Sequence, residues 1–156
     1  MPTQYLSQLA IPVDKGIYLD CGILFPFYFK DAYELNTTRW VGDICTWLKH
    51  FKVKTTRQVW LEARKAYNTV PLSKREKKRI KPLYDKVLSS IESVTVPVKA
   101  TEGRLSPADL SLLNRPDPDI PLLTSDRALY YADPKAVLLL WDKDLQQLSC
   151  MTEKVV

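Results

Sequence analysis

Four acidic residues that are far apart in the chain occupy positions where α/β proteins often place reactive side chains. Asp20 closes the apolar segment "GIYLD" (16–20), and Asp126 follows the apolar segment "IPLLT" (120–124). Glu62 lies on the edge of the apolar stripe of a predicted helix, and Asp109 lies in the first turn of another. Parallel strands end at one edge of a sheet, where ligands of open α/β sheets bind. Asp20 and Asp126 can therefore come together at this edge, where they could share one pocket.

Each of these acids also has a purely structural interpretation. Asp20 could be a turn residue, and Asp126 could cap the helix that follows it. Asp109 stands three residues after Ser106, which is the spacing of a capping box. Glu62 is harder to explain in this way, because a carboxylate beside apolar residues loses hydration unless it is paired or binds a cation. Clustered carboxylates repel one another, and a divalent metal ion would relieve that repulsion.

The pattern of apolar and polar residues predicts the elements that carry these acids. Helices expected from amphipathic spacing and capping residues alternate with short strands that are apolar rather than alternating. The predicted strands are 16–20, 53–56, 93–98, 120–124 and 136–141, and no strand is predicted after 141. The predicted helices are 37–51, 57–67, 72–92, 106–114 and 125–132. This order predicts an α/β fold with three layers, α/β/α, and a mostly parallel central sheet.

Four quoted segments together resemble the PIN domain, a nuclease fold found in bacterial toxin-antitoxin ribonucleases and in relatives of flap endonucleases. They are "IYLDCGIL", "TTRQVWLEARK", "SPADLSLL" and "PLLTSDRAL". The resemblance runs from about residue 16 to residue 141, and each acid falls on the element where the family has its own. The "LLTSD" block followed by a helix is the most specific part.

The resemblance implies a metal-dependent nuclease that hydrolyses phosphodiester bonds, most typically an endoribonuclease, and it implies a PIN-like fold. Asp20, Glu62, Asp109 and Asp126 would be the catalytic and metal-binding acids. Oxygen ligands of this kind favour Mg²⁺ or Mn²⁺. The products would carry a 5′-phosphate and a 3′-hydroxyl. Thr124 and Ser125 match the hydroxyl residues that precede the last acid, where they would either orient it by hydrogen bonds or cap the helix.

The chain departs from the family directly after its first aspartate. The family commonly has Ser or Thr followed by Asn or Ser there, whereas this chain has Cys21 and Gly22. The departure motivates an alternative hypothesis, a catalytically impaired PIN-fold module that binds RNA or a protein partner. A phosphatase of the haloacid-dehalogenase type also sets an aspartate at a strand end, but it requires a second aspartate where Gly22 stands.

The positive charge of the chain is concentrated in one segment. The chain has a formal net charge of +5, and the segment "LSKREKKRIKP" (72–82) by itself has that excess of basic residues. The six basic residues are Lys74, Arg75, Lys77, Lys78, Arg79 and Lys81. Such a cluster could contact nucleic-acid phosphates or could be a solvated helix face. Arg127, next to the last acid, could contact a phosphate or pair with a neighbouring acid.

Composition limits the remaining possibilities. With 156 residues, of which 46% are hydrophobic and 26% charged, the chain is expected to form a single domain over 1–156. The three cysteines form no CxxC pair, and no apolar run approaches the roughly 20 residues that span a bilayer. We therefore expect a cytoplasmic protein without membrane contact. From the resemblance, its expected partners are an RNA substrate, an antitoxin protein and, as a homodimer, a second copy of the chain.

Overall fold

The computed structural model describes residues 4–9, 11, 15–26, 37–69, 73–97 and 105–152. Leu72 of the basic segment lies outside the described residues. The strands are β1 (Ile17–Leu19), β2 (Val53–Thr56), β3 (Glu92–Val94), β4 (Leu122–Thr124), β5 (Ala136–Asp142) and β6 (Gln147–Met151). The α-helices are α1 (Thr37–Leu48), α2 (Arg57–Asn68), α3 (Lys74–Ser90), α4 (Pro107–Leu113) and α5 (Arg127–Ala132), and the 3₁₀ turns are η1 (Leu6–Gln8) and η2 (Cys21–Leu24).

The six strands form one sheet in the order β3-β2-β1-β4-β5-β6. The first five run parallel, and β6 pairs antiparallel with β5. The predicted α/β class with a mostly parallel sheet is therefore confirmed. The chain builds outward from β1 to β3 and then returns to place β4 on the other side of β1, so the topological switch point lies between β1 and β4.

The prediction that β5 is the last strand is wrong, because β6 follows it. The hairpin between them lacks glycine, and Gln146 adopts the positive φ of 52° that usually marks glycine or asparagine at such a turn. The Asp142 side chain organises the turn by accepting the backbone N–H groups of Asp144 and Leu145 at 3.0 and 3.1 Å. A five-residue strand behind an atypical turn has little signal in the sequence.

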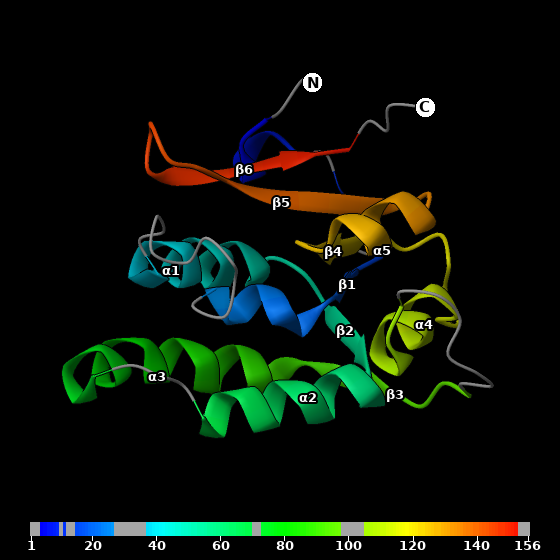
Figure 1. The fold of residues 1–156 in the computed structure, drawn as a ribbon, viewed down its shortest axis with the longest axis horizontal. Helices are drawn as coiled ribbons and strands as arrows, with labels where there is room; N and C mark the ends of the chain where they lie inside the picture. The colour runs from blue at the N-terminus through cyan, green and yellow to red at the C-terminus, as the bar shows by residue number, and fades with distance from the viewer. Residues whose placement is uncertain are drawn as a thin grey trace.

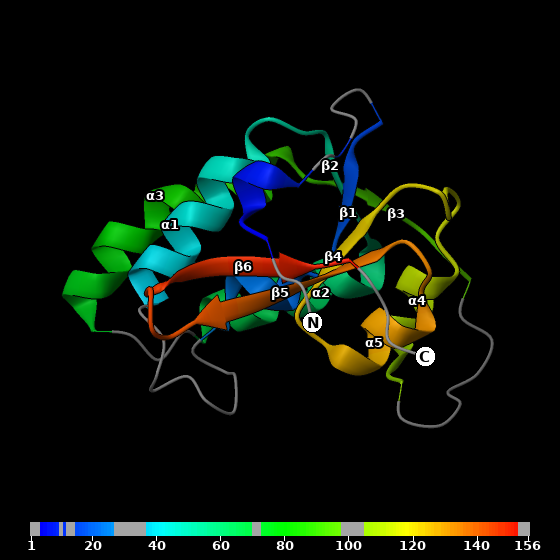
Figure 2. The same cartoon turned by 90° about the horizontal axis from the view of Figure 1, so that it is seen from above.

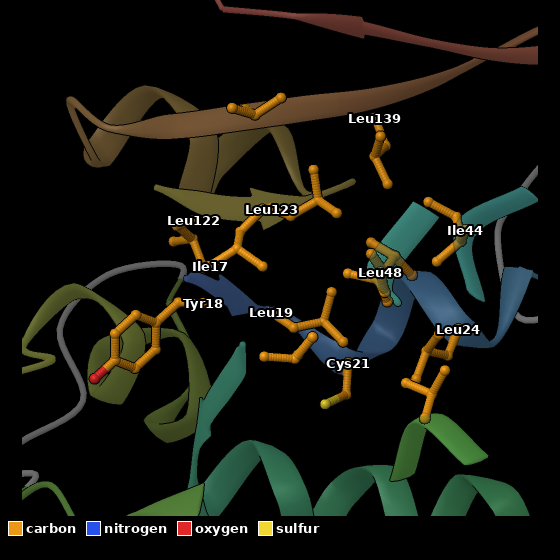
Figure 3. Packing of buried hydrophobic residues seen from close by; sticks show 14 of the residues in the cluster. Ile17, Tyr18, Leu19, Cys21, Leu24, Ile44, Leu48, Leu122, Leu123 and Leu139 are labelled. Carbon is orange, nitrogen blue, oxygen red and sulfur yellow. The ribbon is translucent and has the colours of Figure 1, made fainter. Parts of the chain in front are cut away.

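Helices cover the sheet from two sides. In both views α1 and α3 lie together on one side of the molecule, and α4 and α5 lie together on the other (Figure 1, Figure 2). Side chains of β1 alternate between these layers: Tyr18 points towards α4, away from Leu19 and Cys21 (Figure 3). The Trp40 ring N–H of α1 donates to the Ile23 carbonyl at 2.6 Å, which attaches α1 to the chain that leaves β1.

The boundaries differ from the expected ones by a few residues at most of the element ends. The helix predicted over 37–51 ends at Leu48, and the strand predicted over 93–98 is the short β3. The helix caps expected at Thr56 and Ser106 occur, since each accepts a backbone N–H of the helix that it begins, and Ser73 caps α3 in the same way. None of the described helices is both long and apolar enough to cross a bilayer.

Candidate functional site

Asp20 and Asp126 lie on either side of the topological switch point, and one hydroxyl connects them. The Asp20 N–H donates to the Leu123 carbonyl at 2.9 Å, so Asp20 directly follows β1 beside the end of β4. The buried Thr124 hydroxyl donates to Asp20 Oδ2 at 2.8 Å and accepts the Asp126 backbone N–H at 3.0 Å. Thr124 therefore orients the Asp20 side chain and holds the backbone of Asp126, a connection that the spacing of these residues does not reveal.

Asp126 and Asp109 both cap helices, as their structural interpretation suggests. Asp126 Oδ1 accepts the N–H groups of Ala128 and Leu129 at 2.8 and 3.3 Å. Asp109 Oδ2 accepts the Ser106 N–H at 3.3 Å, and the Ser106 hydroxyl accepts the Asp109 N–H at 3.2 Å. The backbone hydrogen bonds of each cap use one carboxylate oxygen, Oδ1 of Asp126 and Oδ2 of Asp109. Capping therefore leaves both side chains able to ligate.

A buried pair of hydroxyls places α4 against the start of α2. Thr56 ends β2, and its hydroxyl shares a 2.6 Å hydrogen bond with that of Ser111 in α4. The Ser111 hydroxyl also donates to the Ala108 carbonyl at 2.6 Å. Thr56 and Ser111 are both fully buried, so their hydrogen bond fixes the position of α4 against the start of α2. It brings Asp109 and the first turns of α2 to the same edge of the sheet as Asp20.

A cleft runs along α2 from this edge. It has a volume of about 320 Å³ and is lined by Asp20, Gly22, Phe25, Val59, Glu62, Ala63 and Ala66. Glu62 is exposed to solvent on its wall, whereas Val59 and Ala63 are buried beneath it. The cleft thus has two carboxylates, those of Asp20 and Glu62, in a lining that is otherwise apolar.

The carboxylates of this edge affect one another electrostatically. The pKa of Asp20 is raised to about 6, mainly by burial and in smaller part by the charges of Asp109 and Asp126, against the opposing hydrogen bond from Thr124. Desolvation and then the charge of Asp109 raise the pKa of Glu62. The pKa of Asp109 is raised by desolvation and by Asp126. The four acids thus form a negatively charged group at one edge, and none of them forms an ion pair with a described residue.

The four acids influence one another but do not form a metal-binding shell. Within the ranges that the structure describes, no group of three or more His, Cys, Asp or Glu side chains is gathered closely enough to hold a metal ion. The expectation that the four acids converge on one ion is therefore not met by their present side-chain positions. The donor chemistry fits a hard cation, since all the groups are carboxylates and none forms an ion pair with a described residue, although the charge of Lys65 lowers the pKa of Glu62. Coordination requires side chains such as the exposed Glu62 to turn inward.

The remaining predicted site residues occupy different positions. Ser125 has a buried hydroxyl oxygen without a hydrogen-bond partner in the described part of the chain. Arg127 is exposed at the start of α5 and forms no ion pair with a described residue. The six basic residues of α3 are all exposed, and the end of α3 that carries them lies far from α4 in both views (Figure 1, Figure 2). They are therefore not part of the acidic edge.

Arg115 is a residue whose importance the sequence did not indicate. It lies in the loop between α4 and β4, where its buried guanidinium group pairs with the carboxylate of Asp133 at the end of α5. It also donates to the carbonyls of Leu112, Pro118 and Ile120, between 2.9 and 3.3 Å. Arg115 therefore joins the end of α4 to the segment before β4 and to the end of α5. In this way it positions α4, which carries Asp109, and α5, which Asp126 caps.

The cysteines show no sign of redox or nucleophilic chemistry. Cys21, Cys45 and Cys150 are buried free thiols. Burial raises the pKa of Cys21 to about 12, against a hydrogen bond from Thr55, and the charges of Asp20 and Glu62 add to the effect. A thiol with so high a pKa is not a thiolate at neutral pH. Cys21 next to Asp20 is thus a packing residue.

The two roles of Asp126 can be separated by substitution. Asp126→Ala removes the cap of α5 and should lower the free energy of unfolding by about 1 kcal/mol. Asp126→Asn keeps an oxygen acceptor for the same N–H groups and should leave stability near that of the wild type. Urea denaturation of both variants measures this difference. Equal destabilisation by the two substitutions would show that the charge, rather than the hydrogen bonds, stabilises the helix.

Comparisons with known proteins add no family to these observations. No protein-family model matches the chain, and no curated protein or solved structure matches it either.

Proposed function

We propose that this protein is a divalent-metal-dependent phosphodiesterase with a PIN-like fold that cleaves RNA. The observation that carries the proposal is the placement of Asp20 and Asp126 on the two sides of the switch point, joined through Thr124 and without a cationic partner among the described residues. Ligand sites of open parallel sheets lie at this position. The motif resemblance supplies the reaction type and the preference for RNA.

The four acids have distinct parts in this proposal. Asp20, held by Thr124, and Asp126 would bind the cation from the strand ends, with Asp109 beside them. A bound Mg²⁺ or Mn²⁺ would supply a nucleophilic water at neutral pH and neutralise charge on the leaving oxygen. Glu62 would turn from the cleft wall to complete the ligands or to orient a water molecule. The apolar floor around Ala63 would support the nucleoside beside the reacting phosphate.

A second candidate function is a PIN-fold module that binds RNA or a protein without cleaving. Two observations favour it: Cys21 and Gly22 replace the polar residues expected after Asp20, and the described acids are not gathered into a coordination shell. Such a module would retain the fold and the cleft but would respond neither in stability nor in activity to divalent ions.

A metal titration distinguishes the two functions. Adding Mn²⁺ or Mg²⁺ to the full chain should raise its stability by about 2.7 kcal/mol at an ion concentration 100 times the dissociation constant, because the ion binds the folded state alone. The thermal midpoint and the cleavage of end-labelled RNA are measured at constant ionic strength, with Na⁺ as the control. Absence of both stabilisation and cleavage would favour the binding module and contradict the proposed hydrolase.

A further inference from the structure

The first turns of α3 project beyond the hydrophobic core. All residues from 74 to 79 are exposed, and Ile80 is the first buried one. The rest of the helix is anchored, since Tyr84, Val87 and Leu88 are buried and the Tyr84 hydroxyl donates to the Leu24 carbonyl. A helix end that is polar on all sides gains little from packing. Its side chains are therefore available to a partner.

This projecting segment has an excess of positive charge with few internal partners. Its five cations together with Lys81, one residue beyond the buried Ile80, are called the basic end of α3 here: Lys74, Arg75, Lys77, Lys78, Arg79 and Lys81. Lys81 pairs with Asp85 at 2.9 Å, whereas the other five form no ion pair with a described residue. The single acid among them, Glu76, accepts a hydrogen bond from the Ser73 hydroxyl at 2.9 Å. Cations in a first turn also oppose the helix dipole, so the segment favours a polyanionic partner.

The basic end of α3 follows α2 in the chain, and α2 lines the cleft. The lining residues of α2 run from Val59 to Ala66, near the last residue of that helix, Asn68. Five residues, 69–73, connect α2 to α3, which limits the separation of Asn68 and Lys74 to about 20 Å. Asp20 and Glu62 line the same cleft. A flexible polyanion that lies in the cleft and continues past the end of α2 could contact both these acids and the basic end of α3.

We infer that the basic end of α3 binds the phosphate backbone of an RNA strand several nucleotides away from the bond that the acids would cleave. The inference rests on the proposed function for the direction of the strand, but the binding itself requires no metal. It makes the substrate a chain long enough to run from the acidic edge along α2. An oligonucleotide too short to reach α3 gains nothing from these cations.

The test compares two variants with the same loss of charge. The first is Lys74→Gln with Lys77→Gln and Lys78→Gln, and the control is Lys52→Gln with Lys135→Gln and Lys143→Gln, which removes three exposed cations elsewhere. Fluorescence anisotropy in EDTA measures binding to RNA of about 4 and about 16 nucleotides. For the longer RNA, the first variant should bind about tenfold or more weakly at low salt, and the slope of log affinity against log salt should fall by about 2.

The outcomes separate this inference from the proposed function. The control variant should bind both RNAs as the wild type does, and the first variant should bind the short RNA normally with an unchanged thermal midpoint. Equal affinity of all proteins for the longer RNA would overturn the inference, as would binding of the basic end to anionic lipid vesicles instead of RNA. If the wild type binds long RNA through these lysines but never cleaves it with Mn²⁺, the proposed hydrolase fails and the inference stands.

Discussion

Replacing Asp20 with Asn is expected to lower metal-dependent RNA cleavage by about 100-fold or more, the usual effect of removing one preorganised charged group from a reaction centre. Asn keeps the shape of the side chain and an oxygen that can accept the Thr124 hydroxyl, so the local structure should survive. What it loses is the negative charge that would bind the cation. Single-turnover cleavage of labelled RNA with saturating Mn²⁺ measures the effect.

The same substitution should not destabilise the protein, which separates a functional role from a structural one. In the absence of metal the pKa of Asp20 is about 6, above its ordinary value of 3.8, so the folded state holds this proton more tightly than the unfolded state. The free energy of unfolding should therefore fall as the pH rises from about 4 to about 6, by up to about 3 kcal/mol. Asp20→Asn removes this dependence and should equal or exceed wild-type stability at pH 7.

Urea denaturation in EDTA at several pH values measures this stability effect. Asp119→Asn is the matched control, because it removes one exposed carboxylate outside the acidic edge. It should change neither cleavage nor the pH dependence. Retained cleavage by Asp20→Asn would remove this residue from the reaction centre, and a large loss of stability at pH 7 would show that its carboxylate is mainly structural.

Arg115→Met should produce the largest loss of stability among single substitutions in the loop before β4. The change leaves the carboxylate of Asp133 buried without its cation and removes the donors to three backbone carbonyls. Breaking a buried ion pair from one side typically costs about 3 to 5 kcal/mol. For a chain of this length the thermal midpoint should fall by about 6 to 20 °C. Differential scanning calorimetry measures it directly.

The exposed ion pair of α1 provides the comparison. Arg39 and Asp43 are 3.9 Å apart, and both side chains are about half exposed. Arg39→Met should cost less than about 1 kcal/mol, because water screens such a pair. If Arg115→Met lowered the midpoint no further than Arg39→Met, the buried pair would not be what holds α4, β4 and α5 together.

Most of the fold could be predicted from local patterns. Amphipathic spacing predicted α1 and α2 to within a few residues of their observed bounds. The capping residues Thr56 and Ser106 marked the starts of α2 and α4. Strand β6 escaped prediction because its turn uses Gln146 where glycine is usual, and its pairing with β5 depends on a partner strand rather than on its own composition.

The candidate site was predictable in its residue types and only partly in its arrangement. Asp20 and Asp126 could be assigned to one edge because both follow short apolar segments, and parallel strands end together. Their connection through Thr124 could not, because it depends on side-chain directions across two strands. Glu62 and Asp109 reach the same edge through the buried contact between Thr56 and Ser111, for which the sequence has no local signal.

By itself the sequence predicted most of the secondary structure, the α/β class with a mostly parallel sheet and a set of candidate acids, because caps and apolar periodicity act over a few neighbouring residues. Only the tertiary structure decided which of these residues meet. Thr124 reaches Asp20 across 104 positions, and Arg115 reaches Asp133 across 18. Such contacts depend on the strand order β3-β2-β1-β4-β5-β6, which follows from the packing of the whole core and not from any one segment.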